Sequence, residues 1–265
     1  MNELALFAGA GGGILGGVLL GWRTVCAVEL DTFCAKRLMQ RQNEGHIPPF
    51  PIWDDVCSFD GRPWRGLVDV VSGGFPCQDI SVAGRGAGID GGKSGLWGQM
   101  ARIICEVRPR YALVENSPAL TARGLGRVLG DLAAMGFNAQ WGVLSAAAYG
   151  AWHQRERIWI VADAGSDGLR EQQGWSGREG GAREGIAADD GEAGQASDSD
   201  VWRKLQPQGC EPDKRGRAGN GAWWSSEPEL VRVVYGVANR VDRIRALGNG
   251  QVPAVARGAW ETLKR

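Results

Sequence analysis

Short apolar runs alternate with longer amphipathic stretches over residues 1–165 of the chain. The short runs are rich in Val, Leu, Ile and aromatic residues, which is typical of buried strands, and the stretches between them have helical spacing. Strands are predicted over residues 4–7, 24–28, 68–72, 111–115, 141–145 and 158–162, and helices over 32–42, 94–107 and 124–135. Strands alternating with helices through short links predict an α/β fold with a mostly parallel, doubly wound sheet.

The hydrophobic pattern stops after residue 165. Twelve of the 57 residues in 166–222 are glycine, and the segment is net acidic, so it offers too little apolar surface for an ordinary core. We interpret it as a weakly ordered insertion. Apolar periodicity returns in 223–265, with a strand predicted over 229–235 and a helix over 252–263 that opens near Pro253. The predicted organisation is a catalytic part (1–165), the insertion (166–222) and a C-terminal segment that returns to the catalytic part (223–265).

Composition narrows the class of protein. The 265 residues contain 30 Lys and Arg against 30 Asp and Glu, so no overall basic charge announces a nucleic-acid partner. Six cysteines without a CxxC pair give no indication of a zinc or redox site. The apolar start of the chain is interrupted by glycines, which suit a turn better than a signal peptide, and no stretch is long enough to span a membrane. We therefore expect a cytoplasmic protein without a metal or a membrane partner.

Two features point to a nucleotide-like ligand. The first predicted strand runs into Phe7-Ala8-Gly9-Ala10-Gly11-Gly12 and then a helix, and glycines at such a turn let the backbone approach a ligand closely. Glu29 ends the second strand, where a carboxylate can accept hydrogen bonds from ribose hydroxyls. Packing glycines and a solvated carboxylate are the plainer alternatives. No Lys or Arg follows the glycines as in a triphosphate-binding loop.

Reactive residues follow the middle strands. Gly73-Gly74-Phe75-Pro76-Cys77-Gln78 comes after an apolar run, which places Cys77 on a tight loop at a sheet edge. Glu115 ends the next strand, so it shares that edge if the two strands are parallel neighbours, and partial burial would let its carboxyl keep a proton near neutral pH. Arg155 and Arg157 precede the strand at 158–162 and can direct a guanidinium toward Glu115. Each residue also has a plainer interpretation. Cys77 can be a buried thiol, Glu115 an acid at the start of a helix, and the two arginines part of a solvated charge cluster.

These segments, in this order, resemble the motifs of the DNA (cytosine-5) methyltransferases. The resemblance extends from residue 6 to residue 253 and includes Asp54-Asp55-Val56, Ser94-Gly95-Leu96-Trp97 and Leu247-Gly248-Asn249-Gly250-Gln251-Val252. It implies a Rossmann-like class I fold and S-adenosylmethionine as methyl donor. The implied cofactor-binding residues are Phe7, Gly9, Gly11, Glu29, Asp55, Pro76, Leu96, Asn249 and Val252.

The resemblance also implies a mechanism. Cys77 would add to C6 of cytosine, Glu115 would protonate N3, and Arg157, supported by Arg155, would face O2. The target base would be swung out of double-stranded DNA. A catalytic loop from about residue 75 to 89 would close on the DNA, and we expect Gln78, Ser81 and Arg85 to contact it.

The chain departs from the family where Trp152-His153 replaces the usual Pro-Gln, and its recognition region is thin. We therefore expect a monomer with a short or relaxed target site, of bacterial, phage or prophage origin. Two alternatives stay open, namely an RNA (tRNA) cytosine-5 methyltransferase and a DNA-binding relative that needs a partner for recognition. A folate-dependent pyrimidine methylase and a nicotinamide dehydrogenase fit less well, because they leave Glu29 or Cys77 without a role.

Overall fold

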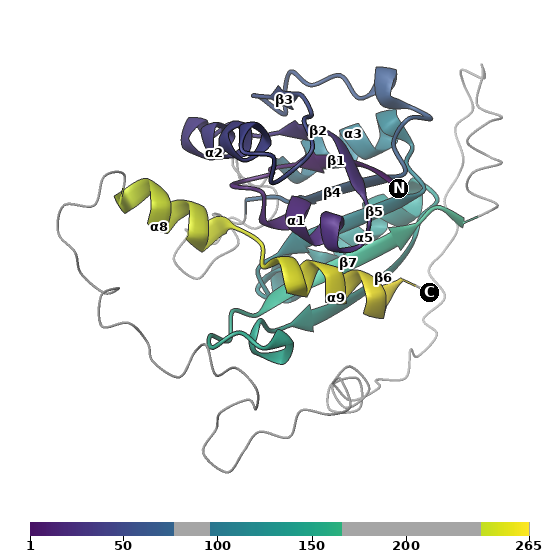
Figure 1. Ribbon diagram of the computed structural model, residues 1–265. Helices are drawn as coiled ribbons and strands as arrows, with labels where there is room; N and C mark the ends of the chain where they lie inside the picture. The colour runs from purple at the N-terminus through teal and green to yellow at the C-terminus, as the bar shows by residue number, and fades with distance from the viewer. Residues whose placement is uncertain (77–95, 166–239, 265) are drawn as a thin grey trace, which may run out of the picture.

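A computed structural model describes residues 1–76, 96–165 and 240–264 (Figure 1). The described chain forms a seven-stranded sheet with helices on both of its faces. The strands are β1 (Asn2–Leu6), β2 (Arg23–Val28), β3 (Ile52–Trp53), β4 (Val70–Gly74), β5 (Tyr111–Asn116), β6 (Asn138–Leu144) and β7 (Arg157–Asp163). The helices are α1 (Gly12–Leu19), α2 (Thr32–Asn43), α3 (Leu96–Val107), α4 (Leu120–Arg123), α5 (Leu125–Ala134), α8 (Arg240–Asn249) and α9 (Pro253–Leu263), with 3₁₀ turns at η1 (Arg62–Trp64) and η3 (Ala147–Tyr149).

The strand order is β3-β2-β1-β4-β5-β7-β6. Strands β1 to β5 pair in parallel, which confirms the predicted α/β fold with a mostly parallel sheet. Among the described strands, β7 alone runs in the opposite direction, because it inserts antiparallel between β5 and β6. The N-terminal end of β7 therefore lies at the same sheet edge as the C-terminal ends of β4 and β5.

Alternating side chains along the strands form two separate hydrophobic layers. On one face, Leu4 and Leu6 of β1 join the core beneath α3 and α5. On the other face, Ala5 packs beneath α1 and α2, and the middle of the sheet packs beneath α9. Helix α9 lies alongside α1 (Figure 1), and the Trp22 and Trp260 rings meet edge to face at 4.7 Å. The C-terminal segment thus closes one face of the sheet next to the start of the chain.

Most predicted elements of residues 1–165 are present, with ends displaced by a few residues. Strand β4 runs to Gly74, two residues beyond the prediction, because its partner β5 continues to Glu115 and Asn116 and keeps the ladder going. Helix α5 ends before Gly136, whose φ of 87° suits only a glycine stop. Helix α8 was not predicted. The insertion at 166–222 and the strand predicted at 229–235 lie outside the described residues. Within the described ranges, no helix is long and apolar enough to cross a membrane.

Candidate active site

The loop between β1 and α1 forms one wall of a pocket. Gly11 is the N-cap of α1 and adopts a left-handed backbone with φ of 92°, a conformation that glycine reaches at little cost. Phe7, just after β1, has φ of 51°, which is unusual for a residue with a side chain. Backbone in such sparsely populated regions gathers at ligand-binding sites. The first amide groups of α1 have no helical partners and are therefore available to a ligand.

Glu29 lies beside this loop at the end of β2. Its two carboxylate oxygens accept hydrogen bonds from the backbone amides of Gly9 (2.6 Å) and Asp31 (2.7 Å). Burial raises the pKa of Glu29, and these two amide donors oppose that rise. Each oxygen of an ionised carboxylate can accept a second hydrogen bond. The carboxylate is thus fixed in orientation and still able to accept from two vicinal hydroxyls of a ribose.

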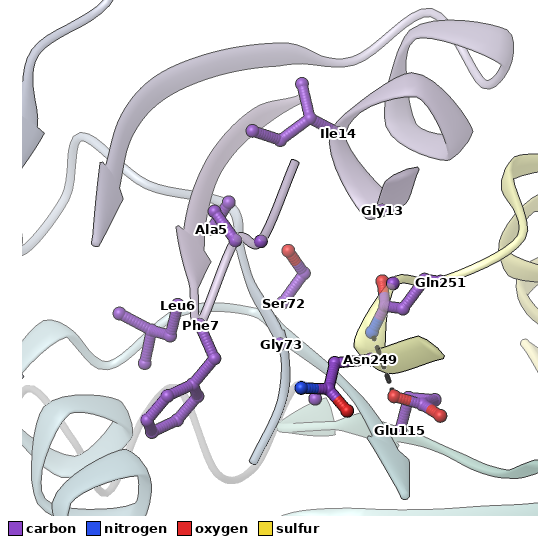
Figure 2. Close-up of a pocket in the computed structure, with 14 residues that line it drawn as sticks. Ala5, Leu6, Phe7, Gly13, Ile14, Ser72, Gly73, Glu115, Asn249 and Gln251 are labelled. Atoms are coloured by element: carbon purple, nitrogen blue, oxygen red, sulfur yellow. Dashed lines mark hydrogen bonds between the residues drawn. The ribbon is translucent and has the colours of Figure 1, made fainter. Parts of the chain in front are cut away.

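A pocket opens at the C-terminal ends of β1, β4 and β5 (Figure 2). It is lined by Ala5, Leu6, Phe7, Ala8, Gly9, Gly13, Ile14, Ser72, Gly73, Gly74, Glu115, Asn249, Gly250 and Gln251. Ligands of open α/β sheets bind at this edge of the strands. Residues from the two ends of the chain therefore share one pocket with the acid that ends β5.

Glu115, which lines this pocket, forms an ion pair with Arg157. Parallel pairing of β4 and β5 places Glu115 opposite Gly74, three residues before Cys77, as the sequence predicted. Arg157 begins the antiparallel neighbour β7, and its Nε lies 3.0 Å from Glu115 Oε1. Glu115 is only 8% exposed, and burial raises its pKa although Arg157, Gln251 and Arg155 all favour the charged form. A buried acid with a raised pKa next to a cation can donate a proton to a base held there.

Arg155 reaches a different target from Arg157. Its Nη2 donates hydrogen bonds to the carbonyl oxygens of Gly248 (2.7 Å) and Gly250 (2.5 Å). Its φ of 37° turns the chain at this point, so that two arginines separated by one residue diverge. We expected Arg155 to support Arg157 from nearby. Its hydrogen bonds hold the turn that joins α8 to α9, and its positive charge also favours the ionised form of Glu115.

The start of the loop that carries the predicted nucleophile is anchored from β5. Asn116 donates from its side-chain amide to the carbonyl oxygen of Phe75 (3.1 Å), and the Phe75 ring packs against Trp97 at 5.4 Å. Pro76, a predicted cofactor-binding residue, follows directly and is partly buried. Cys77 itself lies outside the described residues, as do the predicted DNA contacts Gln78, Ser81 and Arg85.

The other predicted cofactor-binding residues differ in their position. Phe7, Gly9 and Asn249 line the pocket. Asp55 follows β3 and accepts from the backbone amide of Cys57 (2.8 Å), which holds its carboxylate within its own loop. Leu96, at the start of α3, packs against the main core, and Val252 is the N-cap of α9. Neither of these two is part of the pocket lining.

Gln251 is a pocket residue that sequence reasoning did not single out. Its side-chain amide faces Glu115 across the pocket, with Nε2 3.5 Å from Glu115 Oε2 (Figure 2). The sequence did contain a signal for it. Gln251 is a polar residue between Gly250 and Val252, in a segment already assigned to the cofactor site.

The residues present fit a nucleoside-type methyl donor. Glu29 offers a fixed carboxylate for hydroxyl groups, and the glycine loop offers close backbone approach. Ser72, Glu115 and Asn249 add polar groups that suit a partly charged ligand. Among the described residues, no group of three His, Cys, Asp or Glu side chains is arranged to hold a metal ion.

Comparison with known proteins gives consistent matches. The family model described as C-5 cytosine-specific DNA methylase matches residues 1–205. The type II methyltransferase M.Eco47II of Escherichia coli is 36% identical over 166 residues, which are 60% of this chain and 38% of that protein. M.DsaV of Dactylococcopsis salina is 33% identical over 61% of this chain and 45% of its own length. The chain thus spans less than half the length of these curated relatives.

Solved structures share the same architecture. A putative DNA modification methyltransferase encoded within an Escherichia coli prophage superposes with a TM-score of 0.50 at 23% identity, over 62% of this chain and 46% of that chain. The Dnmt2 methyltransferase of S. pombe superposes with a TM-score of 0.50 at 19% identity, over 62% and 50% of the two chains. At these identities the likeness shows the fold.

Proposed function

Because the chain belongs to the C-5 cytosine-specific DNA methylase family, we propose that it transfers a methyl group from S-adenosylmethionine to C5 of cytosine in double-stranded DNA. One observation carries this proposal beyond family membership. The carboxyl of Glu115, paired with Arg157, lines the same pocket as the glycine loop that would hold the methyl donor. The proposed methyl transfer needs an acid, a cation and a methyl donor around one pyrimidine ring. Glu115, Arg157 and the glycine loop would supply these three from neighbouring positions.

The chemistry assigns a role to each residue. The Cys77 thiolate forms a bond to C6 of the flipped cytosine, and N3 takes the proton of Glu115, so that electron density moves onto C5. Arg157 stabilises the negative charge that develops at O2. When bound, S-adenosylmethionine supplies the electrophilic methyl group that C5 takes. Loss of the C5 proton to a base then expels the thiolate, and N3 returns its proton to Glu115.

The described residues support the binding part of this proposal. Glu29 would accept from the ribose hydroxyls, because both its oxygens are already held in place by backbone amides. Phe7 and Gly9 would line the donor from one side and Asn249 from the other. Gln78, Ser81 and Arg85 would contact the DNA backbone or the base next to the target.

Covalent trapping tests the proposal. We expect a stable adduct when the protein is incubated with S-adenosylmethionine and duplex DNA that contains 5-fluorocytosine, because fluorine at C5 cannot leave as a proton does. Mass spectrometry should map the adduct to Cys77. Cys77→Ser should abolish adduct and turnover while leaving cofactor affinity nearly unchanged.

The matched control is Cys105→Ser, which removes an exposed thiol on α3 and should leave trapping intact. If the adduct forms with tRNA that contains 5-fluorocytosine and not with duplex DNA, the substrate is RNA and the DNA proposal is wrong. An adduct that forms only after a cell extract is added would show that the isolated chain needs a partner. Efficient methylation by Cys77→Ser would refute the mechanism.

A further inference from the structure

The side chain of Gln251 occupies the junction between the donor pocket and the Glu115–Arg157 pair. It follows the turn after α8, yet its amide Nε2 reaches to 3.5 Å from Glu115 Oε2 at the end of β5 (Figure 2). These two residues are 136 positions apart in the chain. The distance is at the outer limit of a hydrogen bond, so a small change in it alters the strength of the contact.

The site leaves room for this amide by having glycine at two positions. A Cβ atom on Gly13, at the N-terminus of α1, would overlap Gln251 Oε1. A Cβ atom on Gly74, at the end of β4, would overlap Glu115 Oε2 and approach Gln251 Nε2. Any other residue at Gly13 would displace the Gln251 side chain, and any other residue at Gly74 would displace that of Glu115 and crowd that of Gln251. The amide is therefore enclosed by the cofactor loop on one side and the acid on the other.

The backbone that carries Gln251 is fixed as well. Arg155 donates to the carbonyl oxygens of Gly248 and Gly250, directly before Gln251. On its other side, Val252 caps α9, which packs on the sheet. An anchored turn gives the amide a defined direction, which a residue on a free loop would lack.

We propose that Gln251 is a positioning residue, which holds the Glu115 carboxyl for proton transfer and ties it to the donor pocket. The inference rests on the proposed function, because it assigns Glu115 the delivery of a proton to the target base. Gln251 contacts the acid, so its effect on chemistry is exerted through Glu115.

The effect follows from the donors around Glu115. Arg157 from β7 lies at Oε1 and Gln251 lies at Oε2. Arg155, in the preceding loop, bonds the α8–α9 turn and acts on the acid only through its positive charge. Burial raises the pKa of Glu115, and these three groups oppose the rise. Loss of the Gln251 donor would therefore raise the pKa of Glu115 further and loosen its orientation.

The test is the pH profile of methyl transfer in single turnover, compared between wild type and Gln251→Met, which keeps length and removes the donor. The rate falls with rising pH as Glu115 loses its proton, and we expect this fall to occur at a higher pH in the variant than in wild type. Gln251→Glu, which keeps shape and adds a second acid, should move it further in the same direction. Gln40→Met on the exposed face of α2 is the control and should match wild type.

If the variant is slower by the same factor at every pH, Gln251 has a merely structural role and the proposal is overturned. Identical pH–rate profiles for the variant and wild type would also overturn it. If Gln251→Met does not fold, the pH profile of Gln251→Glu alone is compared with that of wild type. Titration of the ¹³C-labelled Glu115 carboxyl by NMR, assigned with Glu115→Gln, gives the same comparison without turnover. A displaced titration together with absence of DNA methylation would retain the Gln251 inference and reject the proposed function.

Discussion

At the scale of single residues, opposing influences meet on Glu115. Burial favours its neutral form, whereas Arg157 at 3.0 Å favours the charged form, and the net result is a raised pKa. An exposed carboxyl would be ionised near neutral pH and could not protonate a ring nitrogen. A carboxyl without the cation would lose its orientation. The pair therefore suits proton donation better than either residue alone.

Glu115→Gln should lower the rate of methyl transfer by about two to four orders of magnitude, the usual contribution of general acid catalysis. The amide keeps the shape and cannot donate an acidic proton, so cofactor affinity should stay near that of wild type. Single-turnover assays on duplex DNA and calorimetric titration with S-adenosylhomocysteine measure the two quantities. A rate within about tenfold of wild type would remove Glu115 from the mechanism.

At the scale of elements, the start of one strand supplies arginines to two neighbouring parts of the site. Arg157 lies on β7 and turns to Glu115, whereas Arg155, before the strand, turns to the carbonyl groups of the α8–α9 turn. The antiparallel direction of β7 makes this possible, because it brings the start of that strand to the edge where β4 and β5 end. The two arginines of one sequence motif thus bind different partners, so their substitution should have different effects.

Arg155→Met should weaken cofactor binding by about tenfold or more, because two carbonyl groups of the turn lose their charged donor. Asn249 and Gly250, which line the pocket, would then lose their fixed position. Arg157→Lys is the matched contrast and should lower the rate while keeping cofactor affinity. Isothermal titration separates the two effects, and equal cofactor affinity in Arg155→Met and wild type would contradict the assignment.

At the scale of the whole molecule, a second buried acid affects stability. Glu3 of β1 is 1% exposed and accepts hydrogen bonds from Ser72 (2.6 Å) on β4 and Thr24 (2.7 Å) on β2. Burial raises its pKa to about 7, and the two hydroxyl donors oppose that rise. The folded protein therefore holds this proton more tightly than the unfolded chain does. A polar link of this kind joins three strands at the centre of the sheet.

The free energy of unfolding should consequently fall as pH rises from about 4.5 to about 7, and Glu3 contributes at most about 3 kcal/mol to this fall. Glu3→Gln cannot titrate, so its stability should lack this contribution. Urea unfolding at several pH values gives the difference between the two proteins, with Glu261→Gln on the exposed side of α9 as control. Parallel profiles for wild type and Glu3→Gln would contradict the assignment.

Local patterns predicted the elements and the kinds of reactive groups. Apolar runs and helical spacing follow from backbone geometry over a few residues, so the strands around Glu29 and Glu115 and the glycine loop were readable from the sequence. Element ends were less accurate, because pairing extended β4 beyond the apolar run. The proposed role of Cys77 as nucleophile rests on the sequence motif and family membership.

Tertiary structure decided which groups meet. The sequence placed Arg155 next to Arg157, but the direction of β7 sends Arg155 to carbonyl groups 93 and 95 residues away. The contact of Gln251 with Glu115 joins positions 136 residues apart and depends on strand order, on the anchored turn and on two glycines that leave space. No local pattern encodes such contacts, since they arise from how the elements pack. The sequence alone determined the chemistry that was available, and the packing determined which residue each group serves.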